Sequence, residues 1–128
     1  VRIIIAVRVR AVDQQADGLQ DVWAQNFVWR VSIPRDQGDT LTQAWKGPVA
    51  RQWDGALLWL GADACQDVHA RAARAGGHAF LVHSSDNHRV VDSCVHPLDP
   101  VNITLHRLLK NAFDPHRRFN PGRLYEGL

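Results

Sequence analysis

Two positions in the chain carry side chains suited to proton transfer or to the binding of anions. Arg123 follows Asn120-Pro121-Gly122, and an arginine guanidinium can bind a carboxylate or stabilise a developing negative charge. His78 follows Gly76-Gly77, and a histidine titrates near neutral pH, so it can accept a proton in catalysis. The ordinary alternatives are a surface arginine that caps helix carbonyls or stacks on Tyr125, and a strand histidine bonded to the main chain.

Seven histidines invite a metal-site hypothesis, but their spacing does not support one. The sequence contains no HxH or HxxxH pair, and no cysteine stands in register with a histidine. His83 and His88 flank a predicted polar turn, where a solvated pair is the simpler interpretation. Cys65 and Cys94 form no CxxC motif and are expected to be reduced, which suits the cytoplasm. We therefore predict no metal site.

Several other functions are excluded by motif and charge. The nine glycines form neither GxGxxG nor GxxxxGKS/T, the motifs whose main-chain amides cradle a pyrophosphate. A GxSxG nucleophile elbow is also absent. The net charge of +2 is too balanced for electrostatic binding to nucleic acid. The longest apolar run, Ile3–Val7, is far too short to span a membrane.

The local sequence around Arg123 predicts a rigid ending. Asp114-Pro115 should end a preceding helix, because proline lacks an N–H and disfavours helical geometry in the residue before it. Asn120-Pro121-Gly122-Arg123 predicts a type II turn, with proline and glycine at the two central positions. We expect this turn to direct Arg123 and Tyr125 away from the helix.

Alternating apolar residues and turn signals predict a set of strands. The clearest is a hairpin around Asp54-Gly55, because both residues accept the positive φ of a tight turn. The strands predicted from these patterns are 1–9, 27–33, 49–53, 56–60 and 78–83, with a shorter extended piece at 89–95.

Helical spacing of apolar residues predicts three helices. One covers 13–25, one covers 64–75 with Asp63 as its N-cap, and the last begins at Asp99-Pro100. The last has the most regular apolar stripe and is expected to pack against the rest of the chain. Residues 35–42 lack periodicity and are predicted to form a loop. The five tryptophans are expected to fill the core or a domain interface.

The order of these elements predicts an α+β fold. At 128 residues, with 45% hydrophobic and 22% charged residues, the chain is the size of one ordinary globular domain. Helices on one face of a mostly antiparallel sheet form a two-layer sandwich. The pattern alone does not separate the possible two-layer α+β folds. The absence of methionine suggests that the chain is an excised domain.

Four blocks of sequence resemble one protein family. The ending DPHRRFNPGRLY resembles the DPxGxFNPGRxY ending of FAD-linked oxidases of the vanillyl-alcohol oxidase/D-lactate dehydrogenase superfamily. Three upstream blocks resemble its glycolate oxidase FAD-binding E subunit branch: FVWRVSIP (27–34), QWDGALLWL (52–60) and ARAARAGGHAFL (70–81). The match covers about residues 27–128. It departs from the family at Arg117, where the family pattern has glycine.

The resemblance implies that this chain is the C-terminal part of a flavoprotein. Residues 1–112 are then a ferredoxin-like cap domain, and residues 113–128 are a tail that returns to a separate N-terminal FAD domain. That domain would hold the FAD, while Asn120 and Arg123 would lie near the cofactor. The implied reaction is oxidation of glycolate or another small 2-hydroxy acid, which needs a base; GGHA containing His78 is matched without a role. No catalytic residue is assigned.

The implied partners are the FAD domain and other glycolate oxidase subunits, without nucleic acid or a transmembrane segment. The expected location is the cytoplasm, with association to the inner membrane through partner subunits. The isolated chain should be inactive. Two other hypotheses stay open: a non-catalytic assembly subunit, and a free-standing ferredoxin-like module that binds a small molecule.

Overall fold

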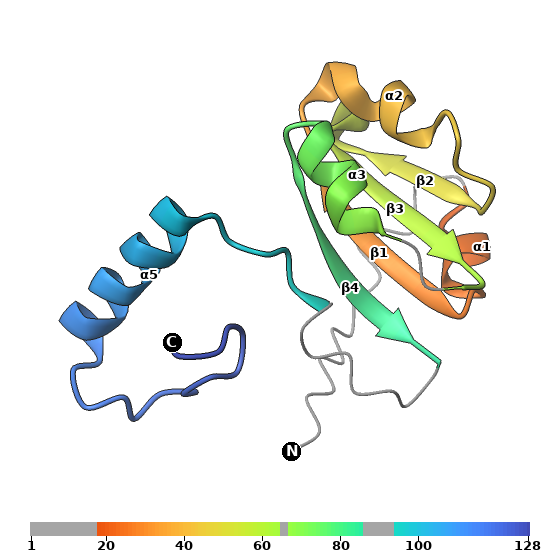
Figure 1. Ribbon diagram of the computed structural model, residues 1–128. Coiled ribbons are helices and arrows are strands. Elements are labelled where there is room, and N and C mark those ends of the chain that lie inside the picture. The colour runs from red at the N-terminus through yellow and green to blue at the C-terminus, as the bar shows by residue number, and fades with distance from the viewer. Residues whose placement is uncertain (1–17, 65–66, 86–93) are drawn as a thin grey trace. The chain divides into compact units, whose positions relative to one another are not determined.

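The computed structural model describes residues 18–64, 67–85 and 94–128 (Figure 1). The strand predicted at 1–9 and most of the extended piece predicted at 89–95 lie outside these ranges. The chain divides into two compact units, one ending at His96 and one beginning at Pro97.

The first unit is built on a four-stranded antiparallel sheet. Its strands are β1 (Phe27–Ser32), β2 (Val49–Gln52), β3 (Leu57–Ala62) and β4 (His78–Ser84), in the spatial order β2-β3-β1-β4. Every neighbouring pair is antiparallel. The described elements from β1 to β4 run β-α-β-β-α-β, the order of the ferredoxin-like motif. The predicted α+β class is confirmed.

The predicted hairpin joins β2 and β3. Its register pairs Val49 with Leu60 and Gln52 with Leu57. The short 3-10 turn η3 (Trp53–Gly55) connects the strands, and Asp54 and Gly55 have φ values of 56° and 89°. The positive φ predicted for the Asp-Gly pair is therefore confirmed.

The helix after β3 begins later than predicted. Helix α3 covers Val68–Arg74, and its N-cap is Asp67 rather than Asp63, because the Asp67 carboxylate accepts the N–H of Ala70 at 3.0 Å. At the other end, the N–H groups of Gly76 and Gly77 donate to the carbonyls of Ala73 and Ala72. This is the Schellman pattern, in which glycine at positive φ ends a helix. The glycine pair thus ends α3, as predicted, and begins β4.

The prediction of a loop at 35–42 was wrong. This stretch forms the 3-10 turn η2 (Arg35–Gln37) and the short helix α2 (Gly38–Thr42). Leu41 is buried in the main core, so tertiary packing outweighs the weak helix propensity of glycine, aspartate and threonine. The helix predicted at 13–25 appears over Leu19–Trp23 as α1, and residues 13–17 are outside the described part.

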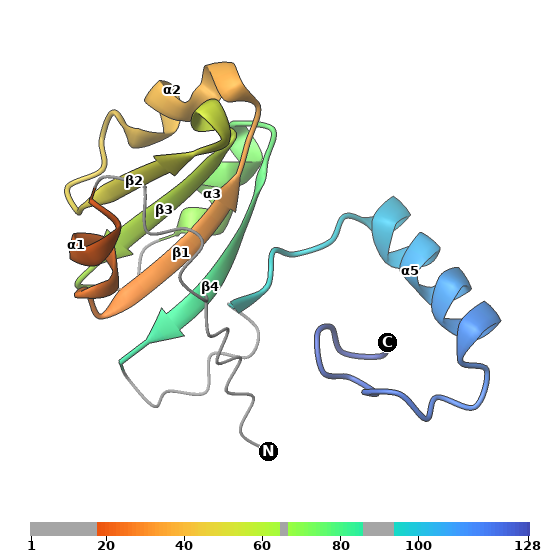
Figure 2. The ribbon, with the colours of Figure 1, turned by 180° about the vertical axis from the view of Figure 1, so that it is seen from behind.

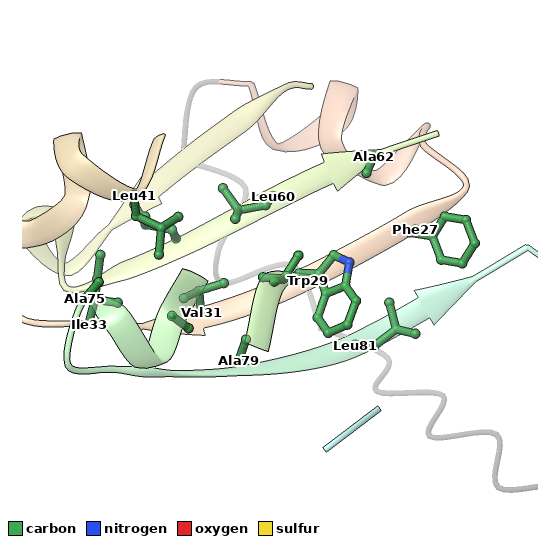
Figure 3. Packing of buried hydrophobic residues seen from close by; sticks show 13 residues of the cluster. Phe27, Trp29, Val31, Ile33, Leu41, Leu60, Ala62, Ala75, Ala79 and Leu81 are labelled. Carbon is green, nitrogen blue, oxygen red and sulfur yellow. The ribbon is translucent and has the colours of Figure 1, made fainter. Parts of the chain in front are cut away.

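Helices α2 and α3 cover one face of the sheet, and the main core lies between them and the sheet (Figure 3). Alternate strand residues supply it, because successive side chains of a strand point to opposite faces. The largest fully buried members are Trp29 and the leucines 58 and 60, each of which stabilises the fold by about 1.5–3 kcal/mol. The other sheet face is partly covered by α1 (Figure 2). Val22 of α1 packs there with Val28 and Trp59.

The second unit consists of helix α5 (Pro100–Phe113) and the residues after it. The predicted start is confirmed, since the Asp99 carboxylate accepts the N–H groups of Val101 and Asn102, both at 2.9 Å. The expected packing is not seen, because α5 has no buried residue. Its apolar side chains are all exposed by half or more: Val101, Leu105, Leu108, Leu109 and Phe113. We call these five residues the α5 apolar surface.

Candidate functional site

The candidate site is the turn that carries Arg123. The Arg123 N–H donates to the carbonyl of Asn120 at 3.3 Å, and Gly122 has a φ of 66°. These are the hydrogen bond and the positive φ that the sequence predicts for this turn. Both predicted cofactor-binding residues, Asn120 and Arg123, belong to it, and the structure brings them together.

The Arg123 side chain is oriented by its partner in the turn. One guanidinium N–H donates to the Asn120 amide oxygen at 3.0 Å. Asn120 has a φ of 47°, a left-handed conformation that asparagine tolerates better than most residues. Because arginine carries five N–H donors, this contact leaves others to bind a carboxylate or another anion. Both side chains are exposed within the chain.

A buried carboxylate fixes the chain between α5 and the turn. Asp114 is only 6% exposed, and it accepts the main-chain N–H groups of Arg118 and Phe119 at 2.8 and 2.9 Å. Its ion pair with Lys110 spans 2.7 Å. Lys110 also donates to the carbonyl oxygen of Phe119. The hydrogen bond from Lys110, followed by those from the two amides, lowers the pKa of Asp114 to about 2.

Sequence reasoning assigned Asp114 only the role of ending the helix and did not identify Lys110. The available signal was their spacing, because an i, i+4 pair of opposite charges faces the same side of a helix. The bond to Phe119 could not be read from spacing, since it depends on how the chain turns after Pro115.

Arg117, which stands where the family pattern has glycine, adopts a backbone conformation that is unfavourable for a residue with a side chain. Arg117 has a φ of 50°, in the left-handed region that glycine enters freely. The Arg117 N–H donates to the carbonyl of Asp114 at 3.0 Å, so the turn forms with arginine in place. For a residue with a side chain this conformation costs about 1–2 kcal/mol.

Tyr125 does not point away from the helix as expected. Its ring lies 6.2 Å from the ring of His106 on α5, at an interplanar angle of 70°. Burial raises the pKa of Tyr125. The prediction extended the direction of the turn to Tyr125, but Tyr125 lies two residues beyond the turn and packs back against the helix.

His78 lies in the other unit, at the start of β4, and its side chain is exposed. Its ring is 6.1 Å from the ring of Phe80 and 6.3 Å from that of His96. The structure therefore places it among other rings of the first unit. His78 and Arg123 belong to different units.

The remaining candidates for chemistry are structural or lie outside the described residues. Trp29 and Trp59 are buried, as expected, whereas Trp53 is 68% exposed and lies 6.0 Å from the guanidinium of Arg30. Cys94 is a half-buried thiol whose pKa is raised by burial. His88 and Cys65 are not described. Over residues 18–64, 67–85 and 94–128, no three His, Cys, Asp or Glu side chains are grouped to hold a metal ion.

None of the described helices combines the length and the apolar character needed to cross a bilayer.

Comparison with known proteins returns one informative similarity. Glycolate oxidase subunit GlcE of Escherichia coli (strain K12) is 34% identical to the chain over 102 residues. The aligned region is 79% of this chain and 27% of GlcE, so the chain spans about a quarter of the length of that relative. No protein-family model matches the sequence, and no solved structure matches it. The resemblance drawn from the four sequence blocks is confirmed: over most of its length this chain is similar to glycolate oxidase subunit GlcE.

Proposed function

We propose that this chain is the C-terminal domain of an FAD-dependent subunit that oxidises glycolate or a related 2-hydroxy acid. Its role is to close the flavin site and to contribute to subunit assembly. The observation that carries the proposal is the 34% identity to GlcE over 102 residues. The four blocks 27–34, 52–60, 70–81 and 114–125 provide the residue-level support.

The residues of the turn suit an anionic partner such as a flavin or a substrate carboxylate. Arg123 offers a fixed positive charge and several N–H donors, and Asn120 holds its side chain at 3.0 Å. When bound, FAD supplies the hydride acceptor of the reaction. Arg123 would stabilise negative charge on the flavin ring or on the substrate carboxylate as hydride leaves the hydroxyl carbon. Asn120 is a positioning residue, because it orients the Arg123 side chain. The sequence contains no glycine-rich pyrophosphate cradle, so FAD is held mainly by another part of the protein.

The resemblance in the four sequence blocks also supports a division into a cap domain and a tail. Residues 1–112 act as the cap domain, and residues 113–128 return to an N-terminal FAD domain. The tail exposes Phe119 and Leu124, which a partner surface can cover. The cap would also contact other glycolate oxidase subunits in the cytoplasm, some of which link the complex to the inner membrane.

A non-catalytic assembly subunit is the second candidate function. The α5 apolar surface favours it, because five large apolar side chains on one exposed helix are typical of a protein contact. In that case the family ending serves only to dock the domain, and a related subunit carries out the chemistry. The two functions differ in whether this protein holds flavin.

Reconstitution of the intact protein with FAD separates the two functions. We expect the intact protein to retain FAD through gel filtration, and a version lacking residues 113–128 to lose part of it. Intact folded protein that retains no FAD would support the assembly role. Full retention by the truncated version would contradict a role of the tail at the flavin.

A further inference from the structure

Three histidines that are distant in sequence meet at one edge of the sheet. His69 belongs to α3, His78 opens β4, and His96 ends the described segment 94–96. The ring centroids of His69 and His96 are 5.5 Å apart, and those of His78 and His96 are 6.3 Å apart. All three belong to the first unit. We call them the histidine cluster; the proposed flavin chemistry makes no use of it.

His96 joins this segment to the sheet through a hydrogen bond that requires a neutral ring. The main-chain N–H of Ala79 donates to Nδ1 of His96 at 3.3 Å. Among the four described strands β4 lies at the edge of the sheet, so this bond satisfies an amide that does not face β1. An imidazolium carries a proton on both nitrogens and cannot accept a hydrogen bond. Protonation of Nδ1 therefore breaks the contact, and the neighbouring Val95 is buried beside it.

His69 also resists protonation. Its Nε2 is buried without a hydrogen-bond partner in the described structure, and its ring lies edge-on to Trp29 at 5.1 Å. A charge placed there would lack an acceptor in an apolar setting, which is unfavourable. Burial, followed by the proximity of His96, lowers the pKa of His69, while Asp67 and the main chain of Ala79 act in the opposite direction.

The described elements that pack against the cluster carry one negative charge beside several positive ones. Burial and then His78 lower the pKa of His96. Asp67 is the one carboxylate on α3 or its cap, on β1, on β4 or on segment 94–96. The other titratable and charged groups on these elements are Arg30 on β1, Arg71 and Arg74 on α3, His83 on β4 and Cys94 on the segment.

We propose that the histidine cluster is a pH-sensitive clasp that holds residues 94–96 against α3 and β4 while its rings are neutral. Residue 96 is directly followed by the unit of residues 97–128, so opening of the clasp frees the connection between the two units. The histidines of an unfolded or released segment titrate near 6.5, above the lowered folded values. The clasp is therefore closed above pH 6.5 and weakens as the pH falls below it.

Amide hydrogen exchange of Ala79 in the full chain tests the proposal. After correction for the intrinsic exchange rate, we expect constant protection between pH 8 and 7. Below pH 6.5, protection should fall by up to about tenfold per pH unit for each proton taken up on opening. Ring resonances should show that the pKa values of His69 and His96 lie below the ordinary histidine value of 6.5.

Two variants and one control make the outcome decisive. His96→Ala should expose the Ala79 amide at every pH, and His69→Phe, which retains a ring, should reduce the slope below pH 6.5. His116→Gln should change neither. If His96→Ala does not fold, His69→Phe and the wild-type titration still decide the question. Equal Ala79 protection at pH 7.5 and 5.5 in the wild type would overturn the clasp, and so would pKa values of His69 and His96 at the ordinary value of 6.5.

Discussion

Asp114 fixes the path of the chain into the candidate site. The buried carboxylate satisfies two main-chain N–H groups, at Arg118 and Phe119, and pairs with Lys110. Its folded pKa of about 2 lies below the ordinary value of 3.8. The stabilisation is thus complete above pH 3.8 and is lost as the pH falls toward 2.

Replacing Asp114 with asparagine should loosen the tail. The asparagine amide is uncharged, so the ion pair with Lys110 is lost, and its NH2 group would oppose one of the two main-chain N–H donors. We expect faster amide exchange at Arg118 and Phe119, together with loss of the acid-dependent change between pH 4 and 2. Glu126→Gln, at an exposed tail position, is the matched control and should leave both unchanged. Identical exchange in Asp114→Asn and wild type would contradict the role of this carboxylate.

The candidate turn shows what could be predicted residue by residue. Proline and glycine encode the hydrogen-bonded turn before Arg123, because each fixes or permits a particular φ. The pairing of Arg123 with Asn120 could not be read in the same way, since it depends on the side-chain torsions. Arg117 gave a signal that was not used: glycine in the family pattern indicates positive φ, and Arg117 adopts 50°.

At the scale of elements, the sequence was most informative where local geometry decides the structure. The turn at Asp54-Gly55 and the end of α3 at Gly76 were predicted correctly, because these residue types tolerate the positive φ that all three adopt. The helix α2 was missed because burial of Leu41 stabilises it, and burial depends on the whole sheet. The position of Asp67 as cap was missed because Asp63 offered an equally good local signal.

The connection between α3 and β4 provides a test of this local geometry. A Cβ added at Gly77 would lie 2.2 Å from the carbonyl oxygen of Ser32, a main-chain atom that cannot move alone. Gly77→Ala should therefore lower the free energy of unfolding by about 1–3 kcal/mol, as overpacking does. Chemical denaturation measures the change. Ala73→Ser, on the exposed face of α3, is the control and should cost no more than about 0.5 kcal/mol; equal losses would refute the close approach.

At the scale of the whole molecule, the division into two units separates two kinds of leucine. Leu58 is fully buried in the first unit, whereas Leu109 is 57% exposed on α5. Apolar periodicity predicted the helix that carries Leu109 but not its exposure, because the same stripe can face a core or another protein surface.

The same substitution should therefore have different effects at the two sites. In this chain, Leu58→Ala should cost about 2–5 kcal/mol of stability, and Leu109→Ala about 0.5 kcal/mol or less. Urea unfolding followed by circular dichroism measures both. A large loss for Leu109→Ala in the chain alone would show that α5 is packed within it. A larger loss in the intact protein than in the chain would locate the covering surface there.

The proposed role of Arg123 also belongs to this scale, because it acts on a cofactor that other polypeptide holds. The Arg123 guanidinium is exposed, and its side chain is oriented by a hydrogen bond to Asn120. The most direct test is glycolate-dependent turnover of the FAD-loaded intact protein with Arg123→Ala, beside Arg118→Ala as an exposed arginine control. We expect turnover to fall about 10²–10³-fold, as when a positioned donor to developing charge is removed, while Arg118→Ala keeps the wild-type rate. Wild-type turnover and FAD content in Arg123→Ala would contradict the account.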